Sequence, residues 1–559
     1  MGCLFYCRYL IVSAMEGKSI FRTMRLPLSH LPTVLLIVGY PIYWLELYAF
    51  RAGRGNTTPL AWIIFCIFAL IVLYRNYTRL VAGARDFCVR FSQEPLSLRL
   101  LLVVAGIGAG VISLCAFYAA LLPPHLVQES DLLNYHLTLP RQHLIMHSFK
   151  HIPWSTADLY LLPIDFSLAP YWLATNLPNK FPQFLFFAGI IPVSFNLVRR
   201  FSGNNFLSLC LIVLAVFGSH SVGIQAGTAM LDLALCYLFL AALDSFLGGA
   251  ILISALEFVF LFWSKSFIPL QLGLTFMALF CLMFVLKKWF MYKVDWNLGR
   301  EIEAGTLNKK KLQQFAVLFL ICSIFIAGPF IAKSMYYAGT PLFPFKVGIL
   351  NPGNGLDRNS PQWQSLLEKS KQCVTTRDDY GAGRSLKEFI GHFWLIAVPE
   401  EGVNNRYDYP VGLMYLLFVG PFLYVFISSL RKKKIGLLPF FVVVYWLVWW
   451  VGSQQTRFLF IPILLMFISV IATNKFQSRI LIIAMLIALF LTGLSVFRAH
   501  RADFGCASWE VLRPKDRELI AMSKTVNRNQ PVKLNYPDVA FADFEVDVQD
   551  TNSVFVLQH

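Results

Sequence analysis

The chain has 559 residues, of which 57% are hydrophobic, 15% aromatic and only 14% charged, and its mean hydropathy is +0.60. Soluble globular proteins carry about 25% charged and 45–50% apolar residues. This composition therefore excludes a soluble enzyme, a secreted disulfide scaffold and a disordered protein. The apolar residues form unbroken runs, whereas the strands of a membrane barrel would alternate. The sequence predicts an all-α polytopic membrane protein.

The predicted membrane spans follow from the apolar runs, since a helix of about 20 residues crosses a hydrocarbon core of about 30 Å. We place about thirteen, at 31–50, 59–75, 98–121, 181–198, 204–219, 226–247, 249–263, 267–287, 314–336, 409–430, 436–451, 457–473 and 479–497. The runs at 226–247 and 249–263 have the weakest pattern, and a re-entrant pair is the alternative for them.

The basic residues indicate the orientation of these spans. They cluster in alternate connecting segments, at Arg75, Arg79, Arg85, Arg90, Arg199, Arg200, Lys287, Lys288, 309–311, 431–434, Lys475 and Arg479. Cytoplasmic loops of membrane proteins carry such an excess of Lys and Arg. The rule places the N-terminus in the cytoplasm and the C-terminus outside. It also explains the net charge of +17 without a nucleic-acid partner.

The polar residues outside the membrane are concentrated in three places. These are the predicted outer loops 122–180 and 337–408 and the tail 498–559. We therefore expect a two-span extension at 1–97, a transmembrane module at 98–497 that carries both loops, and an outer tail. Because these three polar segments are all predicted on the outer side of the membrane, they favour catalysis or recognition at the outer face.

The first outer loop carries the residues with the clearest chemical potential. Glu129 and Asp131 follow directly after a predicted span, where a lipid head group meets water. A carboxylate there can take a proton from an acceptor hydroxyl or amine, although a solvated or helix-capping Asp is the simpler interpretation. Further on, His143, His147 and His151 recur every four residues. This spacing predicts one face of an amphipathic interfacial helix, with zinc binding as the alternative.

Four stretches resemble one family in the same order along the chain. Asp131 begins Asp-x-x-x-Tyr-His-Leu, residues 227–235 read GTAMLDLAL, residues 338–345 read AGTPLFPF, and residues 455–462 read QTRFLFIP. Together they resemble the polytopic GT-C glycosyltransferases, in the bacterial branch related to protein mannosyltransferases and the aminoarabinose transferase of lipid A. Thr340 stands where that family has Asn, and residues 1–97 lie outside the resemblance.

The resemblance implies a GT-C-like helical module that performs inverting transfer of a sugar from a polyprenyl-phosphate donor. The acceptor would be a glycan, lipid or protein at the outer face of a bacterial inner membrane. It implies Asp131 as general base with Asp232 as its helper, a phosphate site of Arg457, Lys265 and Arg141, and acceptor or loop positioning by Glu129, Tyr135 and His136. A divalent metal ion held by Asp131 and Asp232 is the one cofactor expected.

Each role has a simpler alternative. Arg457 fits an interfacial anchor, Lys265 a solvated turn residue, and Asp232 a packing hydrogen bond between helices. Asp232 lies six residues inside its predicted span, where an ionised carboxylate costs up to about 2.5–3.5 kcal/mol, so we expect a partner or a hydrated surrounding for it. A polysaccharide polymerase or ligase and a lipid or solute transporter are the alternative functions.

Overall fold

The fold is almost entirely helical. The computed structural model describes residues 28–50, 57–121, 135–153, 155–174, 180–202, 206–295, 309–345, 356–375, 380–381, 383–398, 407, 410–473 and 478–506. Its helices are α3 (Leu31–Leu45), α4 (Leu60–Gln93), α5 (Leu96–Leu121), α6 (Thr138–Met146), α7 (Pro163–Trp172), α8 (Phe181–Ser202), α9 (Phe206–Phe217), α10 (His220–Gln225), α11 (Asp232–Leu247), α12 (Ile251–Trp263), α13 (Phe267–Phe290), α14 (Lys309–Ile326), α15 (Gly328–Ala338), α16 (Pro361–Thr375), α17 (Leu386–Leu395), α18 (Leu413–Arg431), α19 (Leu437–Val451), α20 (Phe460–Ile471) and α21 (Arg479–Cys506). The short turns are η1 (Leu28–His30), η2 (Glu46–Phe50), η5 (Thr156–Leu159) and η7 (Thr456–Leu459).

The helices confirm the prediction of an all-α polytopic membrane protein. Seven described helices are long and apolar enough to cross a membrane, or eight if the bent pair α14 and α15 counts as one span. α9, α12 and α19 are apolar but shorter, and so is the stretch of η7 and α20 from Thr456 to Ile471. Each predicted span coincides with a helix or with two successive helices, while the number of crossings stays a prediction.

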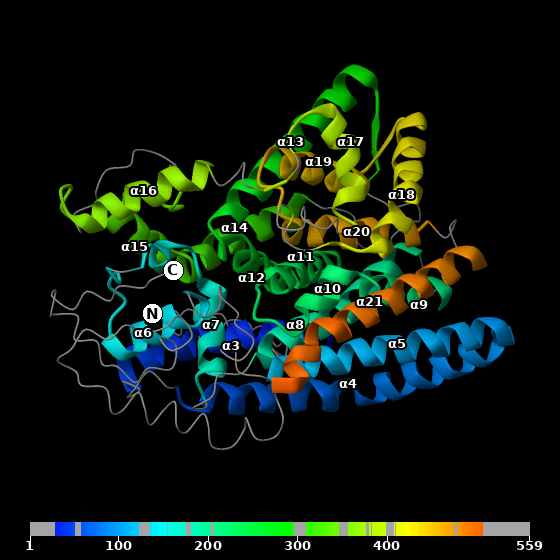
Figure 1. Cartoon of the computed structure of the whole chain (residues 1–559), viewed down its shortest axis with the longest axis horizontal. Helices are drawn as coiled ribbons and strands as arrows, with labels where there is room; N and C mark the ends of the chain where they lie inside the picture. Colours follow the sequence, from blue (N-terminus) through cyan, green and yellow to red (C-terminus); the bar gives the residue numbers. More distant parts are fainter. Residues whose placement is uncertain are drawn as a thin grey trace.

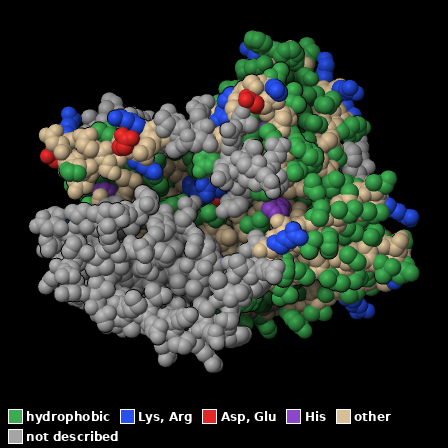
Figure 2. All heavy atoms as spheres, in the orientation of Figure 1, with side chains coloured by type: hydrophobic (Ala, Val, Ile, Leu, Met, Phe, Trp, Pro, Cys, Tyr) green, Lys and Arg blue, Asp and Glu red, His purple; other side chains and the backbone are tan. Residues whose placement is uncertain are grey.

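The apolar helices divide into an outer and an inner set. On α4 and α5, most of the large hydrophobic side chains are exposed, as lipid-facing side chains would be. All twelve residues of α20 are buried, which is typical of a helix surrounded by others. In Figure 1, α5 and α21 run side by side at the lower right, and α16 lies on the opposite side. Figure 2 shows the hydrophobic surface on the right, with Lys and Arg at its edges.

Two three-residue strands join predicted cytoplasmic loops. β1 (Lys293–Asp295) follows α13, β2 (Lys434–Gly436) precedes α19, and they pair in parallel with Lys293 opposite Lys434. The pairing ties two of the basic segments to each other, which agrees with their predicted location on one side of the membrane.

The span at 314–336 is broken in the middle. Its two halves, α14 and α15, are bent by 58° relative to each other. Pro329 lies in the first turn of α15 and cannot donate a backbone hydrogen bond to the preceding turn, which explains why the helix breaks there. The break directs α15 toward the first outer loop, where Lys333 is buried.

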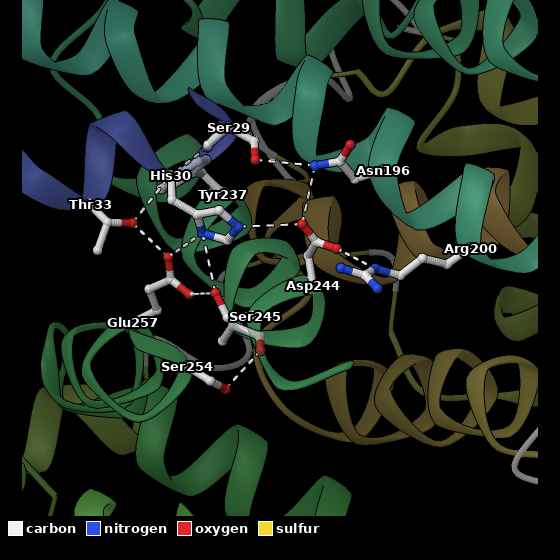
Figure 3. A network of polar contacts seen from close by, with 11 residues as sticks. Ser29, His30, Thr33, Asn196, Arg200, Tyr237, Asp244, Ser245, Ser254 and Glu257 are labelled. Atoms are coloured by element: carbon white, nitrogen blue, oxygen red, sulfur yellow. Dashed lines mark hydrogen bonds and ion pairs between the residues drawn. The ribbon is translucent and has the colours of Figure 1, made fainter. Parts of the chain in front are cut away.

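A buried ionic network joins α3 to α11 and α12. His30 lies between two carboxylates, as Figure 3 shows. Its Nδ1 is 2.7 Å from Glu257 Oε1, and its Nε2 is 3.3 Å from Asp244 Oδ2. All three side chains are at most 2% exposed. Because a carboxylate accepts hydrogen bonds, the imidazole between them serves as the donor that connects the two helices.

Other donors complete the same network. Thr33 Oγ1 donates to Glu257 Oε1 over 2.7 Å, and Ser245 Oγ donates to Glu257 Oε2 over 2.9 Å. Arg200 Nε donates to Asp244 Oδ1 over 2.6 Å. Each carboxylate oxygen of Glu257 and Asp244 therefore accepts a hydrogen bond. Because all of these oxygens have partners, we interpret the network as a structural element and not as a reactive site.

Candidate active site

Asp232 and Lys265 form the centre of the candidate site. Lys265 Nζ donates to Asp232 Oδ1 over 3.0 Å, and the two side chains are 13% and 2% exposed. Asp232 is the first residue of α11, whereas the sequence predicted it six residues inside a span. The difference arises because residues 226–231 are not helical, and within them Met230 N donates to Thr228 Oγ1 over 3.3 Å. The expected partner of Asp232 is thus Lys265, from the turn between α12 and α13.

Arg457 approaches this pair from η7. Its Nη1 is 3.9 Å from Met230 Sδ, two residues before Asp232, and its Nε donates to Gln455 Oε1 over 3.2 Å. The guanidinium carbon lies 5.4 Å from the centre of the Phe458 ring, and Lys265 Nζ lies 6.0 Å from the same centre. The structure therefore brings Lys265, which is held by Asp232, and Arg457 to the same aromatic ring.

His136 also contributes to this region, through an acid that the sequence analysis did not single out. His136 Nδ1 is 2.8 Å from Asp165 Oδ1, and both side chains are at most 1% exposed. Burial raises the pKa of Asp165, and the charges of His136 and Lys265 oppose that rise. Lys265 is thus close enough to act on Asp165 as well as on Asp232. Leu161 N also donates to Ser266 Oγ over 3.4 Å, which ties the loop before α7 to the turn that holds Lys265.

Of the remaining predicted residues, two lie outside the described part of the chain and two lie inside it. Glu129 and Asp131 lie outside the described residues. Tyr135 is partly buried, with its ring against His136 and Tyr160. Arg141 is buried in α6, and its role in phosphate binding stays a prediction.

A metal ion would need more ligands than this group offers. Asp232 already has the ammonium of Lys265 on one oxygen. Over the described parts of the chain, no three His, Cys, Asp or Glu side chains are grouped so that they could hold a metal. The second expected ligand, Asp131, lies outside those parts, so a metal ion held by Asp131 and Asp232 stays a prediction.

The histidines of the first outer loop are arranged differently from the prediction. α6 ends at Met146, and His147 has a left-handed backbone with φ of 47°, so no single helix carries all three. His143 and His151 are buried and converge on Asp158, at 2.7 and 3.1 Å. The expected amphipathic interfacial helix is therefore wrong, because its histidines serve a buried carboxylate.

Lys333 completes this second cluster. Its Nζ donates to Asp158 Oδ1 over 2.8 Å and lies 4.0 Å from the centre of the Phe149 ring. Burial alone would raise the pKa of Asp158, but Lys333 and His143 outweigh it and hold the pKa well below the ordinary value of 3.8. Burial and Lys333 lower the pKa of His143. The cluster fastens the first outer loop to α15.

We expect Asp158→Asn to destabilise the protein by about 3–5 kcal/mol, because it leaves the Lys333 ammonium buried without its counter-charge. Since the folded-state pKa of Asp158 is depressed, the wild-type contribution should be complete above pH 4 and be lost only as the pH falls through that lowered value. Thermal unfolding in detergent at pH 5–7 measures the difference. The control Asp86→Asn removes an exposed ion pair with Arg90 and should cost well under 1 kcal/mol. Equal losses in both variants would contradict a structural role for the cluster.

These features define the class of the molecule: an integral, multi-pass helical membrane protein with buried acid–base pairs close to the ends of α11 and α12. The structure is similar to the crystal structure of ArnT from Cupriavidus metallidurans bound to undecaprenyl phosphate, with a TM-score of 0.45 and 10% sequence identity. The alignment covers 80% of this chain and 85% of that chain. No family model matches the sequence, and no curated protein matches it.

Proposed function

We propose that the chain is a membrane glycosyltransferase. It moves a sugar from a polyprenyl-phosphate carrier to a glycan, lipid or protein acceptor at the outer face of a bacterial inner membrane, with its N-terminus in the cytoplasm and its C-terminus outside. Asp131 is the general base, Lys265 and Arg457 bind the phosphate of the donor, and Arg141 is a further candidate for that role. Glu129 and Tyr135 position the acceptor or the loop that carries Asp131.

The observation that supports this proposal best is the grouping of Lys265 and Arg457 beside Asp232. The departing carrier phosphate gains negative charge as the glycosidic bond breaks, and fixed cations lower the energy of that transition state. Arg457 offers a planar fork that matches two phosphate oxygens. Asp232 holds the Lys265 ammonium at 3.0 Å, which fixes its position before the donor arrives.

The chemistry balances as an inverting displacement. The acceptor O–H or N–H bond breaks and its proton goes to Asp131. A bond forms between the acceptor atom and the anomeric carbon, while the bond from that carbon to the phosphate oxygen breaks. The bonding electrons leave on the carrier phosphate, beside the two cations.

The direct test uses the purified full-length protein in lipid discs with radiolabelled polyprenyl-phosphate mannose or arabinose. An extract of membrane lipids and surface glycans serves as the source of acceptor. We expect release of free polyprenyl phosphate together with label on an acceptor. Passage of intact donor across a vesicle membrane without cleavage would instead favour a transporter and reject the proposal.

Arg457→Ala is expected to weaken donor binding about ten- to a hundredfold, since hydrogen bonds to charged groups contribute about 1.5–3 kcal/mol. Acceptor affinity should change little, because the proposal assigns the guanidinium to the phosphate of the donor and not to the acceptor. Titration with polyprenyl phosphate and with the acceptor extract separates the two effects. Arg358→Ala, at an exposed position before α16, is the matched control. An equal loss of both affinities would show that Arg457 has a structural role.

A further inference from the structure

Three buried polar atoms of the candidate site lack a hydrogen-bond partner within the described residues. They are Asp232 Oδ2, Asp165 Oδ2 and His136 Nε2. Their side chains are at most 2% exposed, whereas Lys265, which acts on both carboxylates, is 13% exposed. A buried polar atom without a partner costs about 1–3 kcal/mol, so native structures leave few of them. The three atoms therefore point to a ligand that supplies the missing hydrogen bonds.

Asp232 Oδ2 and Asp165 Oδ2 are hydrogen-bond acceptors when the two acids are ionised, and His136 Nε2 accepts in the neutral ring and donates in the charged ring. Lys265 occupies the other oxygen of Asp232, and His136 occupies the other oxygen of Asp165. Because His136 Nδ1 faces a carboxylate, Nδ1 carries the proton in the neutral ring and Nε2 keeps its lone pair. A ligand that satisfies this set has to donate hydrogen bonds, and to donate more than one.

We propose that Asp165, His136 and Asp232 recognise the sugar of the donor through its free hydroxyl groups, at a subsite next to the phosphate site. The inference rests on the proposed function and adds the recognition of a hydroxyl-bearing sugar to it. Several hydroxyls on one rigid ring supply several donors in a fixed arrangement, which matches the two carboxylate oxygens, and a hydroxyl can also donate to or accept from His136 Nε2. The His136–Asp165 pair determines which sugar is bound, because binding of the phosphate by Lys265 and Arg457 does not require this pair.

The first experiment compares the affinities of bare polyprenyl phosphate and of polyprenyl-phosphate mannose, glucose, arabinose and 4-amino-arabinose for the full-length protein in lipid discs. For at least one hydroxyl-bearing sugar, the wild-type protein should bind the glycosylated lipid about tenfold more tightly than the bare lipid. In Asp165→Asn and His136→Asn this sugar-dependent gain should disappear, while affinity for the bare lipid does not fall. His136→Asn retains an N–H close to the position of Nδ1 but removes Nε2, so it tests the orphaned atom and preserves the bond to Asp165.

The outcomes separate this inference from the proposed function. If the wild-type protein neither binds polyprenyl phosphate nor releases it from a donor, the proposed function fails. If it binds the bare lipid but gains nothing from any sugar, or gains only from the amino sugar, recognition through hydroxyls is rejected. It is also rejected if both variants keep the gain, or if they lose affinity for the bare lipid as well. Asp86→Asn, the same chemical change on the exposed surface of α4, is the control.

A second measurement identifies the hydroxyl. Deoxy analogues of the sugar with the largest gain are compared in the wild-type protein and in Asp165→Asn. One hydroxyl is expected to donate a hydrogen bond to Asp165. Its removal should lower the affinity of the wild-type protein about tenfold and leave the affinity of Asp165→Asn unchanged, which is the result that a direct interaction gives in a double-mutant cycle. If every deoxy analogue costs both proteins the same, the assignment to Asp165 is wrong.

Discussion

Asp131→Asn is expected to reduce the release of carrier phosphate by about a hundred- to ten-thousandfold, the range that general-base catalysis contributes. Asparagine keeps the size of the side chain but cannot take the proton of the acceptor nucleophile. Donor affinity should remain, because the proposed cations, Lys265 and Arg457, are untouched. Single-turnover release of labelled lipid phosphate, measured beside donor titration, checks both statements.

The same residue tests the topology. A cysteine at position 131 should react with an impermeant thiol reagent added outside intact cells, in a background without the other exposed cysteines, such as Cys66, Cys88 and Cys281. Labelling from the cytoplasm alone would overturn the outer-face mechanism. Asp86→Asn again supplies the control for turnover, and unchanged turnover in Asp131→Asn would remove the general base from the proposal.

His30→Ala should lower the stability of the folded protein by about 3–5 kcal/mol. It removes the donor that lies 2.7 Å from Glu257 and 3.3 Å from Asp244, and both carboxylates are then buried without their imidazole partner (Figure 3). Loss of one member of a buried, hydrogen-bonded ion pair typically costs this much. The unfolding midpoint in detergent and the rate of proteolysis measure the effect.

Arg358→Ala is the matched control, because it also truncates a polar side chain to alanine, at an exposed position. It should leave the midpoint nearly unchanged. The partner variant Glu257→Gln keeps the size of the side chain and relieves part of the charge, so combining it with His30→Ala should cost less than the two single losses added together. Additive losses would mean that the two side chains act independently, which contradicts the network.

The sequence predicted the helices well because their signals are local. Long apolar runs and the positions of basic residues are enough to locate spans, and the polar break around Lys265 does form a turn between two helices. The resemblance to the GT-C family also indicated Asp232, Lys265 and Arg457 as site residues. Their proximity depends on how α11, α12 and η7 pack, which no local pattern records.

The parts that sequence reasoning missed depend on burial inside a loop. Asp158 and Asp165 were not singled out, since each lies in a segment that was read only as an outer loop. An acid in the first turn of a helix, as Asp165 is in α7, is common at a helix N-terminus and gives a weak signal. The end of α6 was missed because His147, and not glycine, adopts the left-handed backbone there.

The way His30 connects α3 to α11 and α12 has a consequence for chain truncation. A shortened chain that begins at residue 98 would lack both His30 and Thr33, which donate to the same oxygen of Glu257. In the shortened chain, the carboxylate of Glu257 would stay buried in the bundle without these two hydrogen-bond donors. Shortened versions intended for expression should therefore keep α3, or carry a neutral side chain at position 257.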